Sequence, residues 1–276
     1  MQYPAYISAS RLKLADRCIR KFIGKYPSAN AAPAEEESPA LSYGRAFHDG
    51  AELLTNTPGA TVSEECPLTT IEMREYLGTM LPFWKDADVY TEVPTCTLAK
   101  TIAEDRSRTF TGESALDLYI LGMPVVGYID ALVPGVGILD HKTMKNGYHA
   151  KTGDDLAQDL QMMLYANYYM LRYPEQNGLY LAHGQYYKSP RRKDPKHNLV
   201  QTYVTYGDVV AFRQEVIEPL VRRVIDAWDC GVTFSEAAPE GRDNNACYDY
   251  GGCEFGPRGD KSCAIRKIMP AAWRKK

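Results

Sequence analysis

The feature that most constrains the fold is a pair of apolar, β-branched runs joined by a Pro/Gly turn. The runs span residues 125–133 and 138–143, and the turn between them is Pro-Gly-Val-Gly. Apolar runs around a turn of this composition are typical of a β-hairpin. The segment therefore predicts two paired strands whose register can be counted outward from the turn.

Two acids and a lysine fall where this hairpin would bring them together. Counting outward from the turn places Asp130 opposite Asp140. Because side chains alternate along a strand, Asp140 and Lys142 share one face and His141 points to the other. Carboxylates are the ligands that hard divalent cations prefer, and a lysine beside them adds positive charge near a phosphate. The pattern indicates a metal site that cleaves phosphodiesters, or else a surface hairpin with an ordinary Asp–Lys ion pair.

A first predicted helix carries a histidine. Residues 42–54 have the composition of a helix, and Ser42 is the expected N-cap. His48 lies on a side of this helix that has small residues, which would allow another element to approach closely. A single helical histidine is more often structural, so this signal is weak alone.

A second predicted helix, over residues 155–171, carries a polar stripe on a largely apolar surface. Three- and four-residue spacing places Gln158, Gln161 and Tyr165 on that stripe. Such side chains need polar partners if they are buried. The stripe indicates a site beside the helix, or else simple exposure to solvent.

Taken in order, these motifs resemble one branch of a known superfamily. They are His48, Gly127-x-x-Asp130, Asp140-x-Lys142-Thr143 and Gln161-x-x-x-Tyr165. Each is weak alone, but the four in this order resemble the RecB-type branch of the PD-(D/E)xK nucleases. That branch includes the RecB and AddB nuclease domains, Cas4 and many phage exonucleases. The resemblance implies an α/β fold in which helices flank a central mixed sheet with a restriction-endonuclease-like core.

The resemblance also implies roles for individual residues. The implied ligands of Mg²⁺ or Mn²⁺ are His48, Asp130, Asp140 and the backbone carbonyl of His141. Lys142 would position or activate the nucleophile. Gln161 and Tyr165 would orient the lysine and contact the substrate strand. In this branch an acid often precedes the Gly-x-x-Asp motif, and Glu113 is the candidate for it, with Glu92 as a rival.

Seven cysteines give a second pattern. Their odd number and uneven spacing argue against a complete disulfide framework. Cys18 is early, whereas a tail over residues 240–276, rich in Gly, Asp, Asn and Pro, holds Cys247, Cys253 and Cys263. A tail of this composition buries little apolar surface, so a bound metal that links its cysteines would stabilise it.

One early and three late cysteines resemble the iron–sulfur pattern of AddB and Cas4, which implies a [4Fe–4S] cluster that pins the tail near Cys18. The late spacings are wider than in those families, and Ile19 stands where proline is frequent. Zinc and unligated thiols are the alternatives. Cys66, Cys96 and Cys230 are expected to be small hydrophobic residues that are buried or partly buried.

Length and composition indicate one domain over residues 1–276, with a helical insertion at 55–90 that includes a helix at 70–81. Another long helix is expected over 207–229, with Pro219 as a point of kinking. No apolar run approaches the roughly 20 residues that a membrane span needs. The first residues lack the charged and apolar regions of a secretory signal, so we expect a cytoplasmic protein without membrane contact.

The net charge of −3 means that a nucleic-acid enzyme of this sequence must concentrate its positive charge locally. One basic loop joins the predicted strands 184–187 and 199–204, and a second basic segment runs from Lys13 to Lys25. Phosphate contacts are expected at the following residues: Arg191, Arg192, Lys193 and, beside the active-site stripe, Gln158.

These observations favour a metal-dependent DNA nuclease, specifically an exonuclease that acts on ends or single strands in recombination, repair or phage DNA metabolism. DNA is the expected partner, and proteins of recombination or replication are further candidates. Two alternatives stay open. One is a structure-specific or Cas4-like endonuclease that trims DNA, and the other is a non-catalytic DNA-binding module of the same fold.

Overall fold

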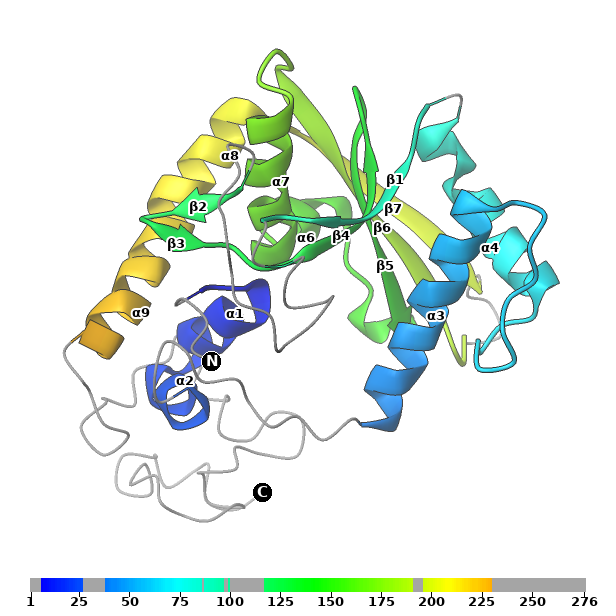
Figure 1. Cartoon of the computed structure of the whole chain (residues 1–276), viewed down its shortest axis with the longest axis horizontal. Helices are drawn as coiled ribbons and strands as arrows, with labels where there is room; N and C mark the ends of the chain where they lie inside the picture. The colour runs from blue at the N-terminus through cyan, green and yellow to red at the C-terminus, as the bar shows by residue number, and fades with distance from the viewer. Residues whose placement is uncertain are drawn as a thin grey trace.

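The centre of the molecule is a mixed five-stranded sheet with strand order β1-β4-β5-β6-β7 (Figure 1). The computed structural model describes residues 6–26, 38–85, 87–96, 99, 117–190 and 196–229. The strands are β1 (Tyr90–Pro94), β4 (Tyr128–Val133), β5 (Gly137–Met144), β6 (Gly178–Tyr187) and β7 (His197–Thr205). Only the β5–β6 pair is parallel within this sheet, and the other neighbours are antiparallel. The predicted mixed sheet is confirmed.

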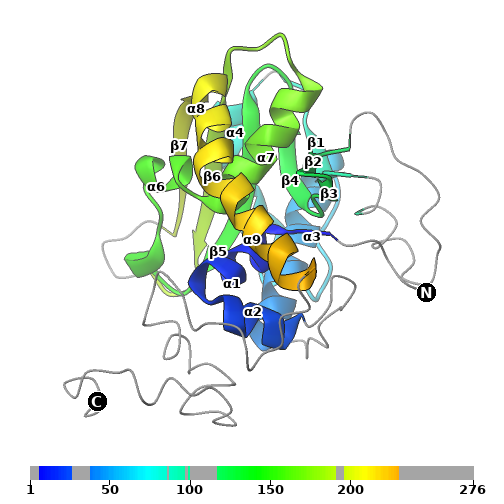
Figure 2. The ribbon, with the colours of Figure 1, turned by 90° about the vertical axis from the view of Figure 1, so that its left-hand side faces the viewer.

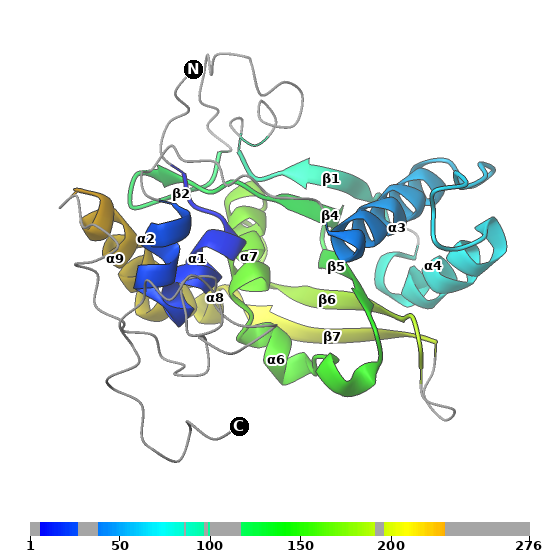
Figure 3. The ribbon, with the colours of Figure 1, turned by 90° about the horizontal axis from the view of Figure 1, so that it is seen from below.

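Helices pack on both faces of the sheet (Figure 3). One face is covered by α3 (Pro39–Asn56) and α4 (Thr70–Trp84), and their core includes Phe47 and Tyr76. The larger core lies on the other face and includes residues of α1 (Ala9–Arg17), α2 (Ile19–Lys25), α7 (Leu160–Arg172), α8 (Tyr206–Phe212) and α9 (Glu218–Asp229). Two smaller elements are α6 (Gly153–Ala157), which packs on β6 and β7, and the hairpin of β2 (Tyr119–Ile120) and β3 (Met123–Pro124). A 3₁₀ turn at Gly147–His149 follows β5.

The predicted hairpin is β4–β5, with the predicted register. Ala131 pairs with Leu139 and Val133 with Gly137, so the next step outward from the turn sets Asp130 opposite Asp140. A side chain at Gly137 would meet the carbonyl oxygen of Tyr180 at 2.0 Å, so this position requires glycine. The first strand begins at Tyr128 rather than at residue 125, because Val125 instead forms an isolated bridge with Ile7 near the N-terminus.

The predicted helix over residues 155–171 is wrong in one respect, because two helices occupy it. α6 ends at Ala157, and Asp159 then serves as the N-cap of α7. Asp159 Oδ1 accepts hydrogen bonds from the backbone N–H groups of Gln161 and Met162, at 2.8 and 3.0 Å. This capping starts a new helix, so Gln158 leaves the stripe of Gln161 and is exposed.

Other predicted helices are present with shifted ends. α3 begins at Pro39 rather than at Ser42, because Ser38 is the N-cap and accepts from the N–H of Leu41. α4 is confirmed over the predicted residues. It begins with a capping box formed by Thr69 and Glu72 and continues to Trp84. Whether residues 55–90 are an insertion stays a prediction.

The long helix expected near residue 207 consists of α8, a π-helical segment (Arg213–Ile217) and α9, which Figure 2 shows as one continuous run. The π segment ends at Ile217, two residues before Pro219, and the N–H of Glu218 bonds to the carbonyl of Arg213. Proline has no N–H for the regular ladder, so a wider turn at this point relieves the expected kink.

Several predicted residues lie outside the described residues: Glu113, Arg191, Arg192, Lys193, Cys230, Cys247, Cys253 and Cys263. Their roles, and the packing of the tail near Cys18, stay predictions. Within the part of the chain that the structure describes, no helix is both long and apolar enough to cross a membrane.

Candidate active site

The structure brings most of the predicted site residues together where the β4–β5 hairpin lies between α3 and α7. His48 comes from α3, Asp130 from β4, and Gln161 with Tyr165 from α7. Asp140 and Lys142 come from β5, and they share the face toward α7 as the alternation predicted. His141 points to the opposite face, toward α3 and α4.

Asp140 is the centre of the first group of contacts. Its Oδ2 lies 2.6 Å from Lys142 Nζ, and its Oδ1 accepts a hydrogen bond from Gln161 Nε2 at 2.9 Å. Gln161 Nε2 also lies 3.3 Å from the hydroxyl of Tyr165. Burial raises the pKa of Asp140 to about 6, the charge of Lys142 opposes this rise, and the charge of Asp130 adds to it.

Asp130 is the centre of the second group. Its Oδ2 accepts a hydrogen bond from the backbone N–H of His141 at 2.6 Å, and its Oδ1 lies 3.4 Å from His48 Nδ1. Burial opposes ionisation of Asp130, but the hydrogen bond and charge of His48 outweigh it and lower the pKa to about 2. Burial likewise opposes protonation of His48, and Asp130 outweighs it, so the pKa of His48 is raised.

The His141 ring anchors β5 to its neighbours. Its Nδ1 lies 2.6 Å from the hydroxyl of Tyr76, and that hydroxyl also donates to the carbonyl of Gly184 on β6 at 2.9 Å. Burial lowers the pKa of His141 to about 4, so the ring is neutral at physiological pH. Tyr76 therefore joins α4, β5 and β6 directly behind the two acids. The implied role of the His141 carbonyl as a ligand stays a prediction.

Glu92 is the acid that the structure places at the site. The pairs Thr91–Ala131 and Val93–Ile129 set Glu92 beside Asp130 on the neighbouring strand. Ligand atoms of Glu92, His48 and Asp130 all lie within 4.8 Å of one another, which is the only group of this kind among the described residues. Burial, followed by the charge of Asp130, raises the pKa of Glu92 to about 7.

The backbone at Glu92 has φ of +47°, an uncommon conformation for a residue other than glycine. Such strained positions cluster at functional sites. The sequence named Glu113 first and Glu92 as its rival, because no local pattern shows that β1 pairs with β4. Asp140 is not part of the three-residue group, so its role as a metal ligand stays a prediction.

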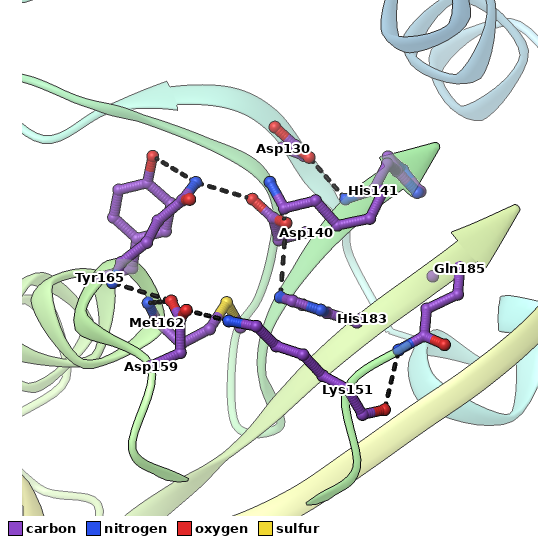
Figure 4. A network of polar contacts seen from close by, with 12 residues as sticks. Asp130, Asp140, His141, Lys151, Asp159, Met162, Tyr165, His183 and Gln185 are labelled. Carbon is purple, nitrogen blue, oxygen red and sulfur yellow. Dashed lines mark hydrogen bonds and ion pairs between the residues drawn. The ribbon is translucent and has the colours of Figure 1, made fainter. Parts of the chain in front are cut away.

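His183 on β6 is a site residue that the sequence did not reveal. It pairs with Asp140 in the parallel register, and its Nε2 lies 3.5 Å from Asp140 Oδ2. Its ring is buried, and its Nδ1 has no hydrogen-bond partner among the described residues. Burial and the charges of Lys142 and Lys151 lower the pKa of His183 to about 3. Figure 4 shows the ring directed toward Asp140.

Comparison with known proteins identifies a family. A model of the PD-(D/E)XK nuclease superfamily matches residues 6–258. A solved structure from Eubacterium rectale, whose assignment as an exonuclease is provisional, is similar with a TM-score of 0.51 and 16% identity, over 97% of this chain and 94% of that chain. At this identity the similarity shows the fold alone.

A weaker similarity, with a TM-score of 0.35 and 13% identity, covers 98% of this chain and 88% of the protein SSO0001, and it carries no argument. No curated protein matches the chain significantly. The superfamily match spans the strands and helices that hold Asp130 and Asp140.

Proposed function

Since the chain belongs to the PD-(D/E)XK nuclease superfamily, we propose that it is a metal-dependent deoxyribonuclease that works as an exonuclease on DNA ends or single strands. The observation that carries the proposal is the convergence of Glu92, Asp130 and Asp140 with Lys142 at one end of the hairpin. Carboxylates that share a buried region disfavour one another's ionised forms unless a cation offsets their charge. A hydrolytic metal centre accounts for this arrangement better than a structural role does.

The side chains present fit a hard divalent cation. His48, Glu92 and Asp130 turn ligand atoms toward one another, and carboxylate-rich sets suit Mg²⁺ and Mn²⁺. Asp140 adds a further buried carboxylate, whose Oδ2 lies 2.6 Å from Lys142 Nζ and 3.5 Å from His183 Nε2. When bound, such a cation supplies hydroxide near neutral pH and offsets charge on the phosphate.

Lys142 supplies the fixed positive charge. Burial opposes its protonation, but the charges of Asp140 and Asp130 outweigh it, so the pKa of Lys142 is raised and the ammonium persists. About a third of its side chain is exposed, so the ammonium can donate to a scissile phosphate or to the attacking water. Gln161 fixes Asp140 through Oδ1, which leaves Oδ2 directed toward the lysine.

The choice of DNA and of strand ends rests on the resemblance of the four motifs to the RecB-type branch. Recombination, repair and phage DNA metabolism are processes that use such an enzyme. A structure-specific or Cas4-like endonuclease would employ the same residues. Substrate preference distinguishes the two, because an endonuclease cuts closed circles and an exonuclease does not.

We also propose that Cys18 holds a [4Fe–4S] cluster together with Cys247, Cys253 and Cys263. Cys18 is buried at the start of α2, where its Sγ accepts from the backbone N–H of Lys21 at 3.4 Å. A sulfur fixed in this way satisfies one requirement of a cluster ligand, and the other three cysteines lie outside the described residues. Zinc is the alternative metal.

The proposed activity is tested with end-labelled linear single strands, linear duplexes and closed circles, each incubated with Mg²⁺, Mn²⁺ or EDTA. We expect metal-dependent loss of linear DNA, with circles intact and the Lys142→Ala variant inactive. Cleaved circles would replace the exonuclease with an endonuclease. Binding without cleavage by the metal-loaded protein would favour a DNA-binding module.

A further inference from the structure

Two lysines from distant parts of the chain meet at the start of α7, next to the candidate active site. Lys13 on α1 reaches Asp159 Oδ2 at 3.2 Å, and Lys151, in the segment before α6, contacts the same oxygen. Figure 4 shows Lys151 and Asp159 on the same side of the sheet as Asp140 and His183. We call Lys13, Lys151 and Asp159 the α7 lysine cluster.

The charges of this cluster do not balance. Asp159 supplies one negative charge, and its other oxygen already caps α7 by accepting two backbone N–H groups. Two ammonium groups share that carboxylate, so a net positive charge is left over. Burial lowers the pKa of Lys13, the charge of Asp159 opposes this, and the charges of Lys151 and Lys142 add to it.

The acid is buried while the lysines reach solvent. The Asp159 side chain is 6% exposed, against 41% for Lys13 and 34% for Lys151. An ammonium has three N–H donors, and a carboxylate contact leaves others available. An anion in solvent can therefore reach the donors that remain.

The backbone of Lys151 is held by a residue of β6. Gln185 on β6 is fully buried, and its Nε2 donates to the backbone carbonyl of Lys151 at 3.0 Å. Its Oε1 in turn accepts from the hydroxyl of Tyr187 at 2.6 Å. A buried amide that holds the backbone of a lysine, together with a buried acid that holds its ammonium, restricts the lysine more than an ordinary surface ion pair requires.

We propose that Lys13 and Lys151, held by Asp159, form a second phosphate site that binds a phosphate of the substrate strand adjacent to the one at Lys142. This inference rests on the proposed nuclease function and extends it to how the strand is held. The ligand chemistry is a nucleic-acid phosphate, either an internal diester or a terminal monoester, and the net positive charge and spare N–H donors of the two ammonium groups suit both. Such a contact positions the strand without reading its sequence.

The experiment compares wild type with Lys13→Gln, Lys151→Gln and the double variant. Initial rates on a single-stranded oligonucleotide give KM and kcat. Affinity is measured in EDTA, by fluorescence anisotropy, over a series of salt concentrations. The oligonucleotide carries a 5′-phosphate, a 3′-phosphate or no terminal phosphate. The control is Arg213→Gln. Arg213 is also a half-buried cation, its exposure is similar to that of the two lysines, and the substitution breaks its ion pair with Glu218.

We expect the double variant to raise KM by about tenfold or more, and to affect kcat less than KM. A plot of log K for DNA binding against log salt concentration has a negative slope. Loss of one phosphate contact should reduce the size of that slope by about 0.7 for a single strand. An effect seen only with one terminal phosphate would identify a monoester, whereas equal effects on all three oligonucleotides would identify an internal diester. The Arg213→Gln variant should match wild type in both measurements.

The structural alternative is that the cluster only ties α1 and the Lys151 segment to α7. In that case the lysine variants would lower the midpoint of thermal unfolding while KM and salt dependence stay unchanged, and this result would overturn the phosphate site. Absence of cleavage by wild type would instead remove the proposed nuclease function. The EDTA titrations would still test phosphate binding, so the two failures are distinguishable.

Discussion

Gly127 lies directly against the ring of Tyr165. A Cβ atom at Gly127 would come within 2.9 Å of Tyr165 Cε1 and 3.3 Å of its hydroxyl. The first residue of the Gly-x-x-Asp motif therefore makes room for the last residue of the Gln-x-x-x-Tyr motif. Tyr165 in turn lies beside Gln161, which holds Asp140, so this contact links the start of the hairpin to the acid at its other strand.

The Gly127→Ala variant should lose activity and stability together. The added methyl group must displace the Tyr165 ring, at a cost of about 1–3 kcal/mol, and Gln161 moves with it. Urea unfolding and the rate of DNA cleavage measure the two effects. Gly78→Ala is the matched control, because Gly78 is exposed on α4 with nothing near its Cβ position, so it should be neutral or stabilising by up to about 1 kcal/mol. Equal behaviour of the two variants would contradict the packing argument.

Glu92→Gln should weaken metal binding more than it weakens DNA binding. The substitution keeps the shape of the side chain but removes the charge from the group of Glu92, His48 and Asp130. We expect the Mn²⁺ concentration for half-maximal cleavage to rise by about tenfold or more, while DNA affinity in EDTA stays the same. Glu175→Gln, on an exposed turn, provides the control. An unchanged metal requirement would show that Glu92 is not a ligand.

Asp159→Asn should make the protein less sensitive to acid. Burial opposes ionisation of Asp159, but the charges of Lys13 and Lys151 outweigh it. The pKa of Asp159 in the folded protein therefore lies below its pKa in the unfolded chain, which is about 4. This stabilisation is present above the unfolded pKa and is lost as pH falls through the folded pKa. Asparagine also caps helices, so the start of α7 is retained.

At pH 7 the Asp159→Asn variant should be less stable by about 1–3 kcal/mol, and the difference should shrink on acidification. Urea midpoints between pH 7 and pH 3 measure both. Parallel pH profiles for wild type and variant would show that the ion pairs of Asp159 do not contribute to folding.

The cysteine proposal predicts that anaerobically purified protein contains iron in a ratio that fits one [4Fe–4S] cluster, with a broad visible absorption. Cys18→Ser and Cys253→Ser should each abolish that absorption and lower the unfolding temperature. Cys66→Ser is the control, since Cys66 is outside the proposed ligand set. A colourless wild-type protein with zinc in place of iron would convert the cluster into a zinc site, and one with neither metal would leave the thiols unligated.

The sequence predicted the acids on the hairpin because a short turn fixes register locally. Asp130 and Asp140 needed only a count outward from the Pro/Gly turn, and the alternation of a strand then assigned the sides of Lys142 and His141. The local sequence also predicted that His48 and Gln161 lie on helices. That these helices meet the hairpin was implied by the family resemblance.

Contacts between distant segments were not predictable in the same way. His183 meets Asp140 only because β6 lies parallel to β5, and no local pattern encodes that register. The meeting of Lys13 with Asp159 depends on how α1 packs on α7. The break between α6 and α7 has a local cause, because Asp159 caps α7. It was not predicted because apolar residues recur at helical spacing without interruption across residues 155–171.

The most direct test of the central claim compares cleavage of end-labelled linear DNA by wild type and Lys142→Met at saturating Mn²⁺, with DNA affinity measured in parallel. Methionine keeps the length of the lysine stem but removes the charge beside Asp140. The account predicts metal-dependent cleavage by wild type, a loss of at least about a thousandfold in the variant, and nearly unchanged DNA affinity. Full activity of Lys142→Met would contradict the assignment of the hairpin as the catalytic centre.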